Sequence, residues 1–178
     1  MDKKEYKNRH IDELIKQELY SSGAVVIEGI KWCGKTTTSE EHAKSCLYID
    51  EPTSREDNIR LSETNPQQLL DGETPRLIDE WQIAPKLWDA ARFNIDRSNQ
   101  FGLYIFTGSA NPVNNDEIFH SGTGRFSHIR MRTMTLSESG ESSNTVSLKK
   151  LFNKTCKKID GYSDLNLNDV AHCICRGG

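Results

Sequence analysis

The stretch that most constrains the fold is residues 29–36, GIKWCGKT, which match the spacing G-x-x-x-x-G-K-T. The two glycines let the backbone turn sharply and leave no side chain between the amides and a ligand. Successive N–H groups at the start of a following helix favour an anion such as a phosphate. Lys35 is expected to reach the β- and γ-phosphates of a nucleotide, and Thr36 to place its hydroxyl on Mg²⁺. The predicted phosphate-binding residues are Gly29, Ile30, Lys31, Trp32, Cys33, Gly34, Lys35, Thr36 and Thr37.

A phosphate loop needs a strand before it and a helix after it, and the flanking residues are of the right kind. Residues 24–27, AVVI, form a short β-branched apolar run that is typical of a buried strand. Residues 35–45 have helical character. The surroundings therefore favour a nucleotide site. The alternative interpretation is a simple glycine turn between a strand and a helix.

Composition narrows the class of protein. The chain has 178 residues, enough for one α/β domain and an appendage. Its formal net charge of −3 gives no general attraction for nucleic acid or an anionic membrane, although it does not exclude contact with nucleic acid. No apolar run approaches the length of a membrane span. Five cysteines, with no apolar segment at the N-terminus, favour reduced thiols and a cytoplasmic protein.

Apolar runs and helical patterns alternate along the first 135 residues. Strands are expected at residues 24–29, 46–50, 76–80, 103–107 and 128–134, the last one more polar and at a sheet edge. Helices are expected at residues 9–19, at 35–45 and from Pro85 onward, with polar helix and loop over residues 53–72. This alternation predicts an α/β fold with a mostly parallel sheet and helices on both faces. Residues 108–124 are expected to form a loop beside the site.

The chain changes character after residue 135. We expect a core domain over residues 1–135, and a linker with the start of a further region over residues 136–178. The lysines of residues 149–158 are interpreted as a solvated helix face, with nucleic-acid contact as the alternative. Near the end, four apolar residues share one helix face: Leu167, Val170, Ala171 and Ile174. That face is expected to need a partner, such as a domain that this sequence does not contain.

Two acidic residues, Asp79 and Glu80, stand at the carboxyl end of the third expected strand, where a parallel sheet binds its ligands. Asp79 is expected to hold the Mg²⁺ shell, and Glu80 to orient and deprotonate an attacking water. This pair favours hydrolysis over transfer to a second substrate; two solvent-facing acids at a strand end are the alternative. A GTPase is disfavoured, because Gln82 stands where a glycine is required and the chain has no Asn-Lys-x-Asp motif.

Two further segments are candidates for contact with the γ-phosphate. Thr107 and Ser109 flank Gly108 at the end of the fourth strand, where a hydroxyl can touch the attacking water; a simple turn is the alternative. Arg125 follows two glycines and is expected near the carboxyl end of the sheet. There it would stabilise transition-state charge in the same subunit or, through self-association, in a neighbouring one. The alternative is an ordinary surface arginine.

Four runs together carry a resemblance to a known family: GAVVIEGIKWCGKTTT, PRLIDEWQIAPKLWDAAR, FTGSA and HSGTGRFSHIRMRTMTLSESGE. Over residues 6–178 the chain resembles prokaryotic AAA-type P-loop ATPases that carry a C-terminal domain of unknown function. The resemblance implies a three-layer P-loop NTPase sandwich with its strands in the order 5-1-4-3-2. It also implies ATP and Mg²⁺ as ligands, with Lys35 and Thr36 on the phosphates and the metal.

The same resemblance implies roles for the other candidates. Asp79 and Glu80 match the metal-and-base pair, Ser109 or Thr107 the sensor, and Arg125 the glycine–arginine position of the family. Members of the family are much longer, and residues 174–178, ICRGG, resemble the start of their lid region. The chain is therefore expected to be the N-terminal part of a longer protein, without its C-terminal domain.

The leading hypothesis is an ATP-binding module that hydrolyses ATP with Mg²⁺ and drives a conformational switch in a larger protein. Its turnover is expected to be weak or absent in isolation. The first alternative is a P-loop kinase for a small molecule or nucleotide, which needs an acceptor pocket and a mobile arginine-rich lid. The second alternative is a regulatory module that binds ATP with negligible hydrolysis. Glu80 favours hydrolysis, because it makes water the acceptor.

Overall fold

A computed structural model describes residues 6–109, 122–155 and 159–176, without the side chain of Ser109. The chain divides into two compact units. The first contains the described residues of Met1–Tyr6 and His10–Arg132, and the second contains Lys7–Arg9 and the described residues of Thr133–Gly178. The phosphate loop and the acidic pair belong to the first unit. Most of the predicted loop over residues 108–124 lies outside the described residues.

The first unit is built on a five-stranded sheet in which every neighbouring pair of strands is parallel. Its order is β2-β3-β4-β1-β5, which is the predicted order 5-1-4-3-2 counted from the other edge. The predicted polar edge strand is β5. The strands are β1 (Ala24–Gly29), β2 (Ser45–Tyr48), β3 (Arg76–Asp79), β4 (Tyr104–Ser109) and β5 (Phe126–Met131).

The strand ends differ from the predicted ones at three places that matter for the site. β3 ends at Asp79, so Glu80 lies outside the strand. β4 continues to Ser109, two residues beyond its predicted end. β5 begins at Phe126 rather than at residue 128, and ends at Met131 rather than at residue 134. Phe126 is part of this strand because its ring is buried and stacks on Trp88, with 4.1 Å between ring centroids.

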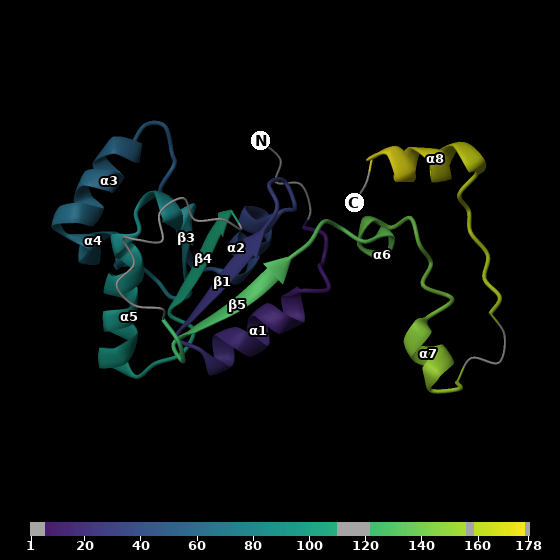
Figure 1. Ribbon diagram of the computed structural model, residues 1–178, viewed down its shortest axis with the longest axis horizontal. Helices are drawn as coiled ribbons and strands as arrows, with labels where there is room; N and C mark the ends of the chain where they lie inside the picture. The colour runs from purple at the N-terminus through teal and green to yellow at the C-terminus, as the bar shows by residue number, and fades with distance from the viewer. Residues whose placement is uncertain (1–5, 110–121, 156–158, 177–178) are drawn as a thin grey trace. The chain divides into compact units, whose positions relative to one another are not determined.

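Helices cover both faces of the sheet (Figure 1). α1 (Asp12–Ser21) and α2 (Lys35–His42) pack on one face. α3 (Arg55–Thr64), α4 (Pro66–Leu70) and α5 (Lys86–Ser98) pack on the other. The predicted three-layer α/β sandwich is therefore confirmed. Because both faces are covered, β1 is apolar at every residue from Ala24 to Ile27 and all four are fully buried.

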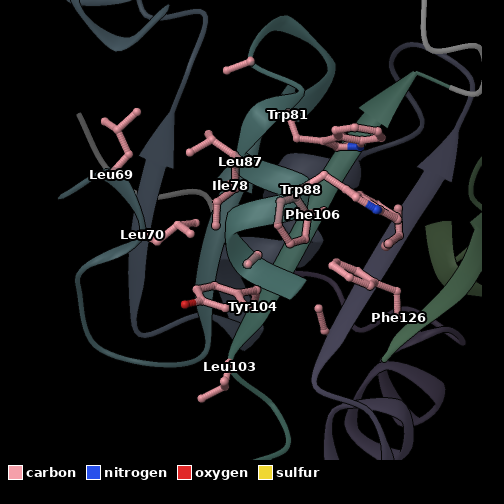
Figure 2. Close-up of a cluster of buried hydrophobic side chains, with 14 of the residues drawn as sticks. Leu69, Leu70, Ile78, Trp81, Leu87, Trp88, Leu103, Tyr104, Phe106 and Phe126 are labelled. Carbon is pink, nitrogen blue, oxygen red and sulfur yellow. The ribbon is translucent and has the colours of Figure 1, made fainter. Parts of the chain in front are cut away.

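The face under α4 and α5 carries a cluster of aromatic rings (Figure 2). Trp88 of α5 lies at its centre, with ring centroids 4.8 Å from Trp81, 5.8 Å from Phe106 and 4.1 Å from Phe126. Rings of this size remove much apolar surface from water and pack with defined geometry. Trp81 directly follows the acidic pair, so the cluster fixes the backbone just beyond it.

The described residues of the second unit form three short helices: α6 (Leu136–Ser139), α7 (Leu148–Phe152) and α8 (Leu167–Arg176). A buried ion pair within this unit joins Arg9 Nε to Glu138 Oε1 at 3.1 Å. Glu138 also completes the capping box of α6 with Thr135. The expected apolar helix face falls on α8, where Leu167 and Ile174 are exposed. None of the described helices is long and apolar enough to cross a membrane.

Candidate functional site

The loop between β1 and α2 has the backbone that a phosphate cradle needs. Gly34 caps α2 with a left-handed φ of 94°, and Trp32 is also left-handed, with a φ of 71°. Gly29 has no room for a side chain, because a Cβ there would lie 2.4 Å from the carbonyl oxygen of Met131 in β5. The strand, the turn and the helix predicted around the glycines are all present. The sequence therefore folds locally into the loop that the motif describes.

Lys35 starts α2 and is nearly buried, with 8% of its surface exposed. Its Nζ donates to the carbonyl oxygens of Gly29 and Ile30, both at 3.0 Å. An ammonium carries three protons, so these two bonds leave one for a further acceptor. Since a buried cation is costly unless an anion is near, this loop favours a negatively charged ligand. The outer side of the loop differs, because Ile30 and Trp32 are mostly exposed.

Thr36 and Thr107 both bind the carboxylate of Asp79. The Thr36 hydroxyl lies 3.1 Å from Oδ1 and 3.2 Å from Oδ2, and the Thr107 hydroxyl donates to Oδ1. The parallel register explains this meeting, because Asp79 of β3 is paired with Thr107 of β4. Burial raises the pKa of the Asp79 carboxyl, while the hydrogen bonds from Thr107 and Thr36 lower it. The nearby charge of Glu80 raises the Asp79 pKa further.

These oxygens suit Mg²⁺. Among the described residues, no three carboxylate, imidazole or thiolate side chains gather to hold a metal without help. Mg²⁺ does not require such a cage, because it prefers oxygen ligands and takes most of them from water and phosphate. The Thr36 hydroxyl and the Asp79 carboxylate supply the two oxygen groups that the protein would contribute. The residues present therefore fit a nucleotide-bound Mg²⁺.

Glu80 follows β3 in an unusual backbone conformation, with a φ of 56° and a ψ of 43°. It precedes a short 3-10 helix, η1 (Trp81–Ile83), and accepts a hydrogen bond from the side-chain amide of Gln82. Sequence reasoning used Gln82 only to argue against a GTPase and missed this contact. The available signal was an amide two residues after the acid pair.

The two sensor candidates differ in what the structure describes. Thr107 is fully buried and its hydroxyl is engaged with Asp79. Ser109 is the last residue of β4, and its backbone pairs with Gly29 of the phosphate loop. The Ser109 side chain lies outside the described part of the chain. A sensor role for either residue stays a prediction.

Arg125 is not where the sequence led us to expect it. Because β5 runs parallel to β1, the residue before β5 lies at the amino end of the sheet. The carbonyl oxygen of Arg125 accepts a hydrogen bond from the amide of Ala24, the first residue of β1. Its guanidinium Nε lies 2.7 Å from Oδ1 of Asp96 in α5. The predicted position near the carboxyl end is therefore wrong, and β1 separates Arg125 from the phosphate loop by about 17 Å, at roughly 3.3 Å per residue.

The comparison with known families agrees with this geometry. A family model described as an AAA domain matches residues 21–140, which include β1 to β5, the phosphate loop and the acidic pair. No curated protein matches the chain.

Proposed function

The chain belongs to the AAA domain family, whose members bind nucleotide, and from this premise we propose that it hydrolyses ATP in a Mg²⁺-dependent reaction. One observation carries the proposal. The carboxyl edge of a single sheet brings together a buried Lys35, a Thr36 hydroxyl bound to Asp79, and the Glu80 carboxylate. Ligands of parallel α/β sheets bind at this edge. The three groups match the needs of a phosphate chain, a metal and an attacking water.

Each group has a distinct task in the proposed reaction. The loop amides and Lys35 bind the β- and γ-phosphates, with Lys35 turning its remaining proton to a phosphate oxygen. Bound Mg²⁺, held by Thr36 and Asp79, would offset the negative charge of the phosphates. Glu80 accepts a proton from water as the water oxygen bonds to the γ-phosphorus. The bond from that phosphorus to the bridging oxygen breaks, and ADP leaves with that bond's electron pair.

We propose further that this reaction serves a conformational switch in a larger protein. The support is the second unit, where α8 leaves Leu167 and Ile174 exposed on an apolar face. Surfaces of this kind are normally covered by another part of a protein. Nucleotide-dependent movement would then be passed to whatever covers this face. We propose that another domain of the larger protein covers this face.

The test is turnover of ATP alone, measured as phosphate release with Mg²⁺ and with excess chelator. Glu80→Gln keeps the shape of the side chain and loses its proton acceptor. It should reduce turnover by roughly 10²-fold or more, the usual scale for a general base, and leave ATP affinity intact. Glu56→Gln, on an exposed face of α3, is the matched control and should retain the parent rate.

Three results would contradict the proposal, and each would favour a different interpretation. Tight ATP binding by a parent chain without turnover would favour a regulatory binding module. Phosphate transfer that requires a second substrate would favour a kinase. Equal rates in the parent chain and in Glu80→Gln would leave Glu80 as an ordinary acid at a strand end.

A further inference from the structure

Gln82 makes a contact that ATP binding alone does not require. Its Nε2 donates to Oε2 of Glu80, the residue proposed to activate water. A carboxylate can only accept hydrogen bonds, so the nitrogen of the amide must face Glu80. The bond uses one oxygen of the carboxylate and leaves the other to accept from water. The amide therefore determines which way the proposed base points.

The backbone around this contact is strained and firmly held. A left-handed conformation is uncommon for a residue that is not glycine, and it persists only where the surroundings fix it. Here the amide of Ile83 donates to the Glu80 carbonyl oxygen at 3.1 Å, closing the turn of η1. Trp81 is 5% exposed, and its ring lies 4.8 Å from that of Trp88. Trp81, which Figure 2 shows beside Trp88, thus anchors Glu80 and Gln82 from the position between them.

Gly108 provides the room that the amide occupies. A Cβ at this position in β4 would lie 2.4 Å from Oε1 of Gln82 and 3.1 Å from Nε1 of Trp81. Any larger residue would therefore push the amide away from its place. Gly108 is paired with Glu28 of β1, one residue before Gly29 of the phosphate loop. The Gln82 amide thus lies over the end of β4 that adjoins this loop.

We propose that Gln82 is the positioning residue of Glu80, and that Gly108 is glycine to admit its amide. This inference rests on the proposed hydrolysis of ATP. Gln82 acts through Glu80, by holding its carboxylate beside the end of β4, where the γ-phosphate and the attacking water would meet. The contact is a separate requirement from the phosphate loop, since neither Lys35 nor Thr36 takes part in it.

The test is Gln82→Met, which keeps the length of the side chain and removes its donor. We expect kcat to fall about tenfold or more. Small errors in the position of a reacting group lower the rate by roughly 10- to 100-fold. ATP affinity, measured by calorimetry, should stay near that of the parent chain. Gln68→Met, on an exposed position of α4, is the control and should match the parent in both.

A double-variant comparison separates positioning from mere support of the fold. If Gln82 acts only through Glu80, adding Gln82→Met to Glu80→Gln should cause no further loss of rate. A structural role would lower the rate in both backgrounds and lower the melting temperature. Independent losses that multiply in the double variant would overturn the proposal, and so would an unchanged or faster Gln82→Met.

Gly108→Ala reaches the same contact from the other side and serves if Gln82→Met fails to fold. Its added methyl group should displace the amide and lower kcat with ATP affinity kept; an unchanged rate would overturn the proposal. The proposed hydrolysis of ATP and the positioning role of Gln82 are contradicted by different results. A parent chain without turnover overturns both. A parent that is active, sensitive to Glu80→Gln and indifferent to Gln82→Met overturns the positioning role alone.

Discussion

The loop after β1 and the turn before β5 both combine glycines with a cation. They lie at opposite edges of one sheet, the first where the strands end (the carboxyl edge) and the second where they begin (the amino edge). Lys35 follows β1 and lies at the carboxyl edge, with Asp79 at the end of β3 and Glu80 just beyond it. Arg125 precedes β5 and lies at the amino edge beside Ala24. The arrows of β1, β4 and β5 point the same way in Figure 1, which makes the separation visible. In a parallel sheet, a residue that follows its strand lies at the carboxyl edge, and a residue that precedes its strand lies at the amino edge.

The chemical surroundings of the two cations follow from these places. Lys35 is buried and bonded to neutral carbonyl oxygens, so it still favours an anionic ligand. Arg125 is about half exposed and already has a carboxylate partner in Asp96. A buried charge without an anion has much to gain from a phosphate, whereas an exposed ion pair has little. Substitutions of the two cations should therefore differ in their effects.

The largest difference is expected in ATP affinity. Lys35→Ala removes the buried cation of the loop, and a charge-assisted contact contributes about 1.5–3 kcal/mol, which corresponds to roughly 10- to 150-fold in the dissociation constant. Arg125→Ala should leave ATP affinity unchanged, because the arginine lies at the other edge. Calorimetry with ATP and Mg²⁺ measures both. Equal losses in the two variants would break the comparison, and no loss in Lys35→Ala would remove the lysine from the site.

A smaller difference is expected when one hydroxyl is removed at each edge. Thr107→Val loses the donor to the half-buried Asp79 carboxylate, and should lower the free energy of unfolding by about 1–3 kcal/mol at neutral pH. Thr123→Val, at an exposed position of the amino edge, should stay within about 0.5 kcal/mol of the parent. Urea unfolding without nucleotide or Mg²⁺ measures both variants.

The effect of Thr107→Val should also depend on pH. Burial raises the pKa of Asp79 in the folded chain, so its ionised form costs stability at any pH above that raised value. The Thr107 hydroxyl offsets part of this cost by binding the carboxylate. As the pH falls through the raised pKa, the carboxyl is protonated and needs the hydroxyl less. The loss caused by Thr107→Val should therefore shrink toward acid pH; a loss that is constant with pH would show that the hydroxyl does not act through Asp79.

Local signals predicted most of the fold and the places of the glycine loop and the acid pair. The glycine loop, the apolar run at residues 24–27 and the acid pair after Ile78 each depend on neighbours in sequence, and the structure has all three. The strand order came from a family resemblance rather than from periodicity. Arg125 was misplaced because it precedes its strand whether that strand begins at residue 128 or at Phe126, and a residue before a parallel strand lies at the amino end of the sheet. The contact of Gln82 with Glu80 depends on the left-handed backbone conformation of Glu80, which no sequence pattern predicted.

The smallest effect is expected from Arg125→Ala. Its partner is an exposed carboxylate, and pairs of this kind contribute about 0.2–1 kcal/mol to stability. Turnover per chain should match that of the parent at every protein concentration, because within one chain Arg125 cannot reach the proposed site.

Contact with the γ-phosphate would require the amino edge of one chain to meet the carboxyl edge of another. Such assembly makes turnover per chain rise with concentration, and a mixture of Arg125→Ala with Glu80→Gln would regain activity at interfaces that combine an intact Glu80 with an intact Arg125. Sedimentation of the parent chain accompanies the mixing experiment, so that a failure to regain activity is interpreted only if the chains associate. Recovery on mixing would show that the arginine completes the site of a neighbour, and that the two edges belong to one catalytic centre after all.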